Sequence, residues 1–293
     1  MTGGSGLVGS ALKDICPEWT YVDSKKYGSF VDVQNVRDMI SAENPDIVVH
    51  LAANVGGLFK NMNKRREMFE DNIRMNTNIL SESANYGVKK VISMLSTCIF
   101  PDGLDELLTP DALHKGPPHP SNEGYAYAKR LIEVHSRIIR ETTPTQTVCL
   151  VPTNVYGPND NFSLEDGHVI PALIHKAWIA KKEGRPLQVR GTGVAKRQFI
   201  HSSDLARIVE WAVENKTPEM VVCCSEKEYT IEEVAKIIAK ETGVDIEFIQ
   251  GADGQMRKTA VPGICPQPKI SLEVGLAKTV QWFISCTSSS LKQ

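Results

Sequence analysis

Short apolar segments alternate with amphipathic segments through the first half of this 293-residue chain, and this alternation restricts the fold more than any other feature. The apolar segments are short and rich in β-branched residues, as buried parallel strands are. Strands that alternate with helices predict an α/β fold built on a doubly wound parallel sheet. The predicted strands are residues 19–22, 47–50, 91–95 and 147–151, and the predicted helices are residues 33–42, 64–86 and 125–140.

The pattern changes after Pro152, where a loop rich in proline and asparagine leads into shorter elements. We expect a nucleotide-binding domain at residues 1–155 and a smaller C-terminal α/β lobe for substrate at residues 156–285, from which the chain can cross back to the first domain. The polar residues 286–293 are expected to fray. In the second half the predicted helices are residues 167–182, 203–214, 231–240 and 272–283, and the predicted strands are residues 187–189, 220–223 and 246–249.

A glycine-rich loop stands at the head of this series. Its glycines have the GxxGxxG spacing, which lets the backbone approach a pyrophosphate that rests on a helix N-terminus. A glycine loop alone is also ordinary turn chemistry, but before a strand–helix series it predicts a Rossmann-type dinucleotide-binding domain. The expected cofactor-binding residues of the loop are Gly3, Ser5, Gly6, Leu7, Val8 and Gly9.

The first strand of this domain is largely missing. Only Met1 and Thr2 precede Gly3, although the strand that feeds the glycine loop is central in a Rossmann-type sheet. We expect about five to eight residues rich in isoleucine and valine upstream of Met1, the usual length of a strand. Without them, we expect the stability of the fold and its affinity for cofactor to be reduced.

Two lysines follow the second predicted strand, where an NAD-binding site usually holds an acidic residue. Lys25 and Lys26 can neutralise a 2′-phosphate and therefore favour NADPH over NAD. Asp23 beside them leaves NAD open, and paired lysines in a loop are also common surface residues.

Tyr125-Ala126-Tyr127-Ala128-Lys129 is the strongest single motif. Tyr125 and Lys129 lie one turn apart on a predicted helix, so their side chains point to the same place. A phenol has a pKa of about 10, and a nearby ammonium is expected to lower that pKa towards the range of acid–base catalysis. Tyr127 is a weaker candidate because Leu131 stands one turn after it, and an ordinary surface Tyr–Lys pair is the alternative.

Two further candidates lie at the ends of predicted elements. Ser96 and Cys98 follow strand 91–95, at the carboxyl edge where open sheets bind ligands, and Ser96 can hydrogen-bond a substrate carbonyl beside Tyr125. Most cysteines are structural, but Cys98 stands among polar residues. His168 begins a predicted helix after a long loop, where a lone histidine is also more often structural.

Composition argues against several classes of protein. A net charge of −2 gives no reason to expect nucleic acid or an anionic membrane as a partner. No apolar run approaches the roughly 18–20 residues of a membrane span, and no signal peptide precedes the first motif. The seven cysteines are scattered without a CxxC pair, which argues against disulfides and a metal site and fits a cytoplasmic protein.

Together with His50-Leu51-Ala52-Ala53 at a strand end, these motifs resemble the extended short-chain dehydrogenase/reductase family. From Thr2 to about Phe283 the chain resembles, more narrowly, the GDP-L-fucose synthases of that family. The segments that carry this resemblance are Asn54-Val55-Gly56-Gly57, Ser96-Thr97-Cys98-Ile99-Phe100-Pro101, Pro152-Thr153-Asn154-Val155-Tyr156-Gly157-Pro158 with Asp160-Asn161-Phe162, and Gly167-His168-Val169-Ile170-Pro171-Ala172-Leu173-Ile174.

The resemblance implies a multifunctional isomerase and oxidoreductase that uses NADPH to convert GDP-4-keto-6-deoxy-D-mannose to GDP-L-fucose, by 3,5-epimerisation and reduction of the 4-keto group. It implies that Cys98 and His168 are the acid–base pair at the carbons beside the ketone. Ser96 and Tyr125 would hold the enolate oxygen, and Tyr125 would protonate the reduced oxygen. Lys129 would tune the tyrosine and bind the nicotinamide ribose.

The same resemblance implies the remaining binding residues and a homodimer formed by the two long helices 64–86 and 125–140. Arg190 stands where relatives often have tryptophan, and Lys176 where some have arginine, so affinity is expected to differ more than the reaction. Two alternatives are another nucleotide-sugar epimerase that recycles tightly bound NAD and an NADP-binding protein without catalysis. The implied cofactor contacts are Ala52, Ala53, Tyr125, Lys129 and Asn154, and the implied substrate contacts are Asn154, His168, Lys176, Arg190, Arg197 and Lys258.

Overall fold

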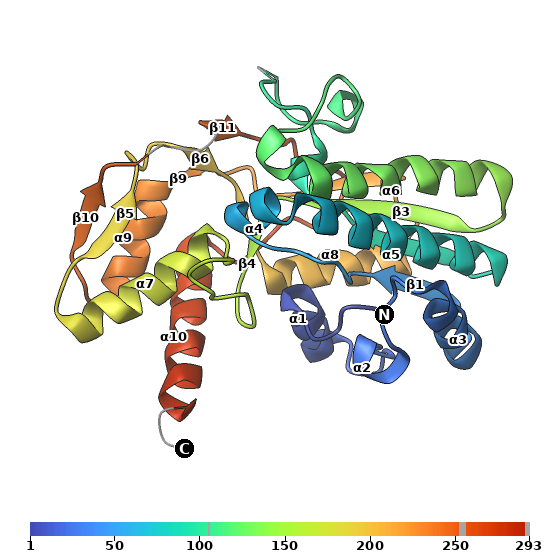
Figure 1. Ribbon diagram of the computed structural model, residues 1–293, viewed down its shortest axis with the longest axis horizontal. Helices are drawn as coiled ribbons and strands as arrows, with labels where there is room; N and C mark the ends of the chain where they lie inside the picture. Colours follow the sequence, from blue (N-terminus) through green and yellow to red (C-terminus); the bar gives the residue numbers. More distant parts are fainter. Residues whose placement is uncertain (105, 252–255, 291–293) are drawn as a thin grey trace.

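The computed structural model describes residues 1–104, 106–251 and 256–290. Its larger lobe is built on a parallel sheet with the strand order β1-β2-β3-β8 (Figure 1). The α/β prediction is therefore confirmed, and four predicted strands lie within one residue of their observed bounds. These strands are β1 (Ile47–His50), β2 (Lys90–Met94), β3 (Gln146–Pro152) and β8 (Met220–Cys223).

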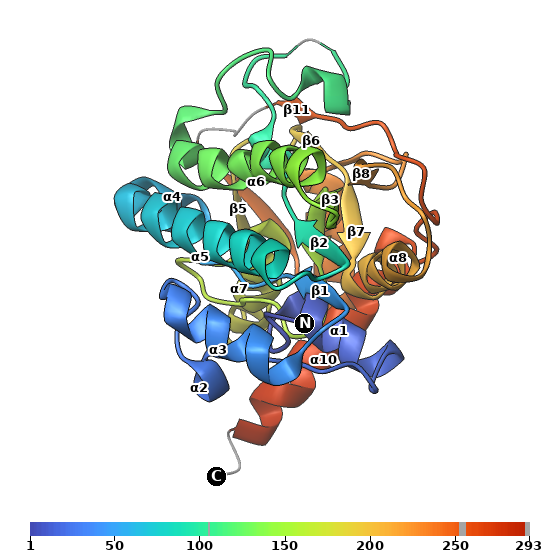
Figure 2. The same ribbon diagram turned by 90° about the vertical axis from the view of Figure 1, so that its right-hand side faces the viewer.

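Helices cover both faces of this sheet (Figure 2). Successive strand residues point to opposite faces, so Val91 packs in one buried cluster and Ile92 in the other. The same division separates Val151 from Leu150 on β3. One face is covered by α3 (Val33–Glu43), α5 (Arg65–Asn85) and α6 (Glu123–Thr142), and the other by α1 (Leu7–Ile15) and α8 (Ser202–Glu214).

Thr2 extends the sheet beyond its edge strand β1. Thr2 forms parallel bridges to Val22 and to His50, and its amide donates to the carbonyl of Val49 at 3.0 Å. The predicted strand 19–22 is reduced to the single bridge at Val22, because a two-residue partner offers no further pairing. A cavity of about 450 Å³ lies next to Met1 and Thr2. Its lining also includes Trp19, Val22, Ile40, Ile47, Val48 and Val49.

An added strand is expected to fill this cavity. We expect an extension of four β-branched residues before Met1 to stabilise the fold by about 2–4 kcal/mol. Each buried aliphatic side chain contributes about 1.5–3 kcal/mol, and each ordered residue costs about 1–2 kcal/mol. The free energy of unfolding, measured in urea, tests this, with a Gly-Ser extension of the same length as the control. Equal stability of the two extended proteins would contradict the prediction.

The same extension is expected to change the pH dependence of stability. The Met1 amine donates to the carbonyl of Thr20 at 2.6 Å, and burial lowers its pKa from 8.0 to about 6. Between those values the unfolded chain binds more protons than the folded chain, so the stability of the parent protein rises as pH rises from 6 to 8. Moving the amine out of the cavity should abolish this rise.

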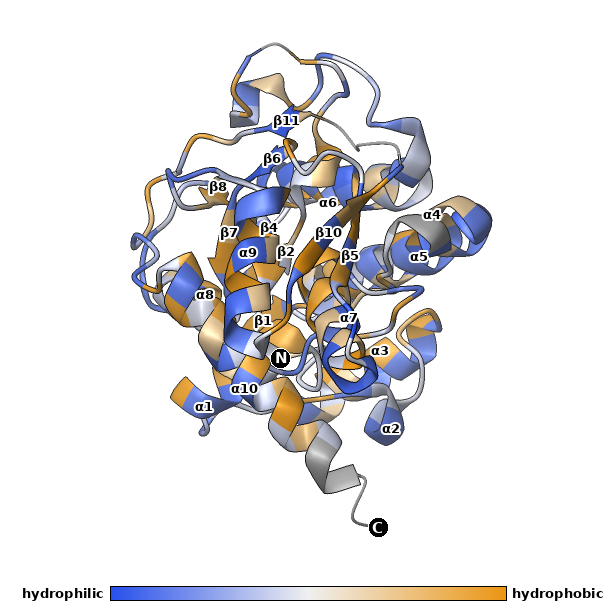
Figure 3. Cartoon of the chain, turned by 90° about the vertical axis from the view of Figure 1, so that its left-hand side faces the viewer, coloured by the Kyte–Doolittle hydropathy of each residue, from blue (hydrophilic) through white to orange (hydrophobic). Residues whose placement is uncertain are grey.

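The smaller lobe has its own buried core, which includes Leu173, Leu187, Val234 and Leu276. Its helices carry hydrophilic and apolar residues on different sides, as helices with one buried face do (Figure 3). Strands β5 and β10 pair in parallel beside these helices. The elements of this lobe are α7 (Val169–Glu183), β5 (Leu187–Arg190), α9 (Ile231–Thr242), β10 (Ile246–Ile249) and α10 (Leu272–Ser290).

The chain crosses back to the larger lobe within residues 156–285, a course that the predicted division left open. Helix α8 and strand β8 belong to the larger lobe. Helix α10 extends to Ser290, so residues 286–290 are helical rather than frayed, and residues 291–293 lie outside the described residues. No helix of the described chain has the length and apolarity needed to cross a membrane. The short strands β4 (Asn154–Tyr156), β6 (Lys196–Arg197), β7 (Phe199–His201), β9 (Tyr229–Thr230) and β11 (Arg257–Lys258) were not predicted.

Candidate functional site

The glycine loop passes very close to the end of β1. Gly3 has a φ of +75°, and a Cβ atom on it would lie 2.7 Å from the amide nitrogen of Ala52. A Cβ atom on Gly9 would lie 2.3 Å from the carbonyl oxygen of Gly3. Gly6 is the N-cap of α1 and supplies no side-chain cap, so the first N–H groups of the helix remain available to an anion. This backbone cradle fits a pyrophosphate.

Replacing Gly9 with alanine should therefore damage cofactor binding. The new methyl group meets backbone atoms on both Gly3 and Gly4, which cannot move without opening the loop. We expect the affinity for NADPH to fall by about a factor of 100, or about 2.7 kcal/mol. Fluorescence titration with NADPH measures this. Gly116→Ala is the control, because its Cβ atom would meet only Pro101 at 3.4 Å, and an equal loss of affinity in both variants would contradict the prediction.

The candidate 2′-phosphate site lies on the short helix α2 (Ser24–Tyr27). The carboxylate of Asp23 caps this helix by accepting from the amides of Lys25 and Lys26 at 3.0 and 3.2 Å. The ammonium of Lys26 pairs with Glu43 at 2.6 Å. Asp23 is thus engaged with backbone, and Lys25 and Lys26 are both exposed. A phosphate bound here would compete with Glu43 for Lys26.

A polar cluster gathers at the carboxyl end of β2. Ser96 caps a short 3-10 helix and accepts from the amide of Cys98 at 3.4 Å. The ammonium of Lys129 donates to the carbonyl of Met94 at 2.8 Å and lies 5.9 Å from the ring centroid of Tyr125. Cys98 and Lys129 are only 8% and 2% exposed. The end of β2 and helix α6 therefore bring four groups together: the hydroxyl of Ser96, the thiol of Cys98, the phenol of Tyr125 and the ammonium of Lys129.

Burial controls the charges of this cluster. It raises the pKa of the Cys98 thiol, against the opposing influence of Lys258, Ser96 and Lys129. Burial also raises the pKa of Tyr125, so the expectation that Lys129 lowers that pKa is wrong. The ammonium of Lys129 is itself desolvated, which lowers its pKa to about 8. Tyr125 therefore holds its proton at neutral pH and can act as an acid.

The sequence did not predict that the buried histidine His50 lies near this cluster. His50 at the end of β1 is 0% exposed; its two ring nitrogens lie 3.0 Å from the hydroxyl of Thr2 and 3.0 Å from the amide oxygen of Asn76. Burial, with a further contribution from Lys129, lowers its pKa to about 3. A neutral ring thus links the first residues of the chain to α5. Its only signal in the sequence is a polar residue ending an apolar strand.

His168, Lys176 and Arg190 are carried by α7 and β5 of the smaller lobe. His168 is the exposed N-cap of α7, and partial desolvation lowers its pKa. The loop before it packs on the glycines after β1, because the amide of Gly57 donates to Asp166 at 2.7 Å. Lys176 and Arg190 line one cavity of about 910 Å³, and burial together with Arg190 lowers the pKa of Lys176.

Arg197 and Lys258 form the second pair of cations. Strand β11 pairs in parallel with β6, with Lys258 opposite Arg197. Burial lowers the pKa of both side chains, and Arg197 lowers that of Lys258 further. Asn154 lies beside them, since its amide group donates to the carbonyl of Gln198 at 2.8 Å. Two desolvated cations side by side fit a diphosphate.

The structure thus brings most of the predicted catalytic and substrate-binding residues into two groups. Ser96, Cys98, Tyr125 and Lys129 meet at the end of β2. Lys258 stands opposite Arg197 in the pairing of β11 with β6, and its charge favours a lower pKa of Cys98. Lys176 and Arg190 share the larger cavity. No hydrogen bond within the described ranges joins His168 to Cys98, so their pairing stays a prediction.

The chain is similar to nucleotide-sugar enzymes over nearly its whole length. Residues 1–224 match the NAD dependent epimerase/dehydratase family. The chain is 39% identical to GDP-L-fucose synthase of Dictyostelium discoideum, over 97% of this chain and 94% of that protein. It is 29% identical to GDP-L-colitose synthase of Yersinia pseudotuberculosis, over 97% of each chain. The crystal structure of a GDP-L-fucose synthetase from Naegleria fowleri bound to NADP has a TM-score of 0.90 and 37% identity, over 98% of this chain and 92% of that one.

Proposed function

The chain belongs to the NAD dependent epimerase/dehydratase family and groups with its GDP-L-fucose synthases, and from this premise we propose that it converts GDP-4-keto-6-deoxy-D-mannose to GDP-L-fucose with NADPH. The observation that carries the proposal is the Cys98 thiol beside Ser96, Tyr125 and Lys129 at one strand end. A reductase needs only the hydroxyls and the lysine. The thiol adds an acid–base group for epimerisation.

The backbone cradle fits NADPH. The positive φ of Gly3 and the close approach of Gly9 leave no room for side chains where the pyrophosphate would lie. Lys25 and Lys26 would meet the 2′-phosphate, and Tyr125 and Lys129 would lie at the nicotinamide ribose. When bound, NADPH supplies the hydride for the 4-keto carbon.

The chain's own residues perform the proton transfers. The 4-keto group acidifies the protons on C3 and C5, because each carbanion is stabilised as an enolate of that ketone. We assign Cys98 and His168 as the acid and base that remove and return these protons. Ser96 and protonated Tyr125 donate hydrogen bonds to the enolate oxygen. After reduction, Tyr125 gives its proton to the oxygen on C4.

Cations hold the nucleotide half of the substrate. Arg197 and Lys258 would bind the diphosphate, with Asn154 beside them. Lys176 and Arg190 line the cavity of about 910 Å³, which is large enough for a nucleoside and gives Arg190 a place to stack on a base. A neutral ligand would not neutralise the desolvated charges of Lys176, Arg197 and Lys258.

Product analysis tests the proposed reaction. The protein is incubated with GDP-4-keto-6-deoxy-D-mannose and NADPH, and the sugar nucleotide is identified by NMR together with NADP⁺ formation. We expect GDP-L-fucose and one NADP⁺ per product. No turnover in this assay would refute the proposal. C4 epimerisation of another nucleotide sugar, supplied in a second assay without NADPH, would then favour the epimerase alternative, and NADPH binding alone would favour the non-catalytic one.

We also propose a cytoplasmic homodimer that pairs α5 and α6 with their copies. These two helices lie side by side in both views of the molecule (Figures 1 and 2). Leu131 and Ile138 of α6 are 40% and 46% exposed, which leaves an apolar strip for a second copy. Sedimentation of the protein and of a Leu131→Glu variant tests the dimer, and a monomeric parent protein would refute it.

A further inference from the structure

Strand β11 places Lys258 in the site, yet it is only two residues long. It forms the edge of a three-stranded sheet with the order β11-β6-β9. Apart from this pairing, the segment gains a bridge through Thr259, whose carbonyl accepts from the amide of Leu108 at 2.8 Å. So short a strand has few ladder hydrogen bonds to fix its register, and side chains must supply the rest.

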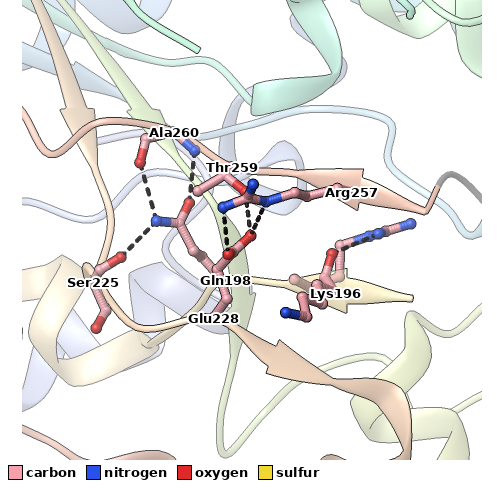
Figure 4. Close-up of polar contacts among 8 residues, drawn as sticks. Lys196, Gln198, Ser225, Glu228, Arg257, Thr259 and Ala260 are labelled. Atoms are coloured by element: carbon pink, nitrogen blue, oxygen red, sulfur yellow. Dashed lines mark hydrogen bonds and ion pairs between the residues drawn. The ribbon is translucent and has the colours of Figure 1, made fainter. Parts of the chain in front are cut away.

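One buried glutamine forms three side-chain hydrogen bonds, two of them to this segment. Gln198, 1% exposed, donates through Nε2 to the carbonyls of Ser225 at 2.8 Å and Ala260 at 3.0 Å. Its Oε1 accepts from the amide of Ala260 at 2.8 Å (Figure 4). Its backbone carbonyl accepts from Asn154. Gln198 directly follows Arg197, so one residue joins the strand of Arg197 to the segment that carries Lys258.

A carboxylate holds the same segment from across the sheet. Glu228 precedes β9 and accepts from Arg257 through two hydrogen bonds, of 3.0 Å from Nε and 2.7 Å from Nη2 (Figure 4). The hydroxyl of Thr259 also donates to Glu228. Arg257 and Thr259 therefore share one side of the strand. Because strand residues alternate, Lys258 between them points to the other side.

We propose that Gln198 and Glu228 are positioning residues that hold Lys258 opposite Arg197, in the diphosphate-binding part of the proposed site. The inference rests on the proposed function, in which Arg197 and Lys258 bind diphosphate and Cys98 exchanges protons. A lysine fixed there would act on both the diphosphate-binding part of the site and the part that exchanges protons. Its ammonium binds phosphate and favours the thiolate of Cys98.

The charges around both groups agree with this geometry. Burial lowers the pKa of Lys258, while Cys98 raises it. On the thiol, Lys258 is the largest influence opposing burial. The charged or titratable groups that interact with Cys98 are Lys258, Lys129, Tyr125 and Arg130, and Asp102 and Arg197 also act on Lys258.

Two substitutions test the positioning role without touching Lys258. Gln198→Met keeps the bulk and removes all three side-chain hydrogen bonds, and Thr259→Val removes only the hydroxyl that donates to Glu228. Each variant is assayed for GDP affinity by calorimetry, and for the pH midpoint of Cys98 alkylation by iodoacetamide, followed at that residue by mass spectrometry. We expect GDP affinity to fall about tenfold in Gln198→Met. The alkylation midpoint should move to higher pH in both.

Matched controls separate positioning from general stability. Arg37→Met removes a comparable forked ion pair between α3 and α5, to Glu82 at 3.0 and 3.3 Å, and these helices lie well away from β11 in Figure 2. It should lower the melting temperature while leaving GDP affinity and the alkylation midpoint unchanged. Thr259→Ser, which keeps the hydroxyl, should behave as the parent protein does.

The outcomes distinguish the inference from the proposed function. If Gln198→Met and Thr259→Val lost only thermal stability, as Arg37→Met does, the positioning role would be overturned. If the parent protein failed to make GDP-L-fucose, the proposed reaction would fall. GDP affinity and thiol alkylation would still decide whether Gln198 and Glu228 position Lys258.

Discussion

Replacing Cys98 with serine should slow the formation of GDP-L-fucose by about 10²–10⁴-fold, the usual contribution of one acid–base group. A hydroxyl is a much weaker acid than a thiol, and Lys258 and Lys129 cannot bring it into a useful range. The direct measurement is the incorporation of deuterium from D₂O at C3 and C5 of the sugar. NADPH affinity should stay close to that of the parent protein.

Cys149→Ser is the matched control for this experiment. Cys149 is also a buried thiol, 1% exposed and in the same core cluster as Cys98, but it lies within β3, where Ser136 and Arg140 are its polar neighbours. It should lose stability and keep deuterium exchange. Exchange at the parent rate in Cys98→Ser would show that the thiol is not the acid or base.

Replacing Tyr125 with phenylalanine should slow hydride transfer by a similar factor of about 10²–10⁴. Burial raises the pKa of this phenol, so the hydroxyl carries its proton at neutral pH and is the donor for the oxygen on C4. Phenylalanine keeps the ring and its packing and removes only that donor. Single-turnover oxidation of NADPH, followed by absorbance, measures the step.

The same helix offers a control for the tyrosine. The ring of Tyr127 lies 5.3 Å from the guanidinium carbon of Arg130 and belongs to another side of α6. Tyr127→Phe should therefore oxidise NADPH at the rate of the parent protein. Equal rates in both variants would refute the role of Tyr125, whereas a loss confined to Tyr125→Phe would support it.

The fold was accessible from the sequence wherever local periodicity decides structure. Strands β1, β2, β3 and β8 and the helices around them follow from apolar residues that repeat with the period of a strand or a helix. The short strands β6 and β11 were missed because two residues carry no periodic pattern. Their pairing depends on neighbours contributed by distant parts of the chain.

The candidate site also has features that local sequence predicts and features that depend on distant parts of the chain. The spacing of Tyr125 and Lys129 brings them together on one helix, and the motif around Ser96 and Cys98 marks a strand end. The direction of the Tyr125 pKa could not be predicted by counting nearby charges. It depends on how completely the folded protein removes water from the phenol.

By itself, the sequence determined the order of helices and strands, the glycine cradle and the groups that can carry the chemistry, because these depend on neighbours along the chain. Only the tertiary structure decided that Lys258 stands opposite Arg197, that Gln198 and Glu228 hydrogen-bond the segment that carries Lys258, and that burial keeps His50 neutral. Those properties arise from contacts between segments far apart in the chain and from the water that their packing excludes.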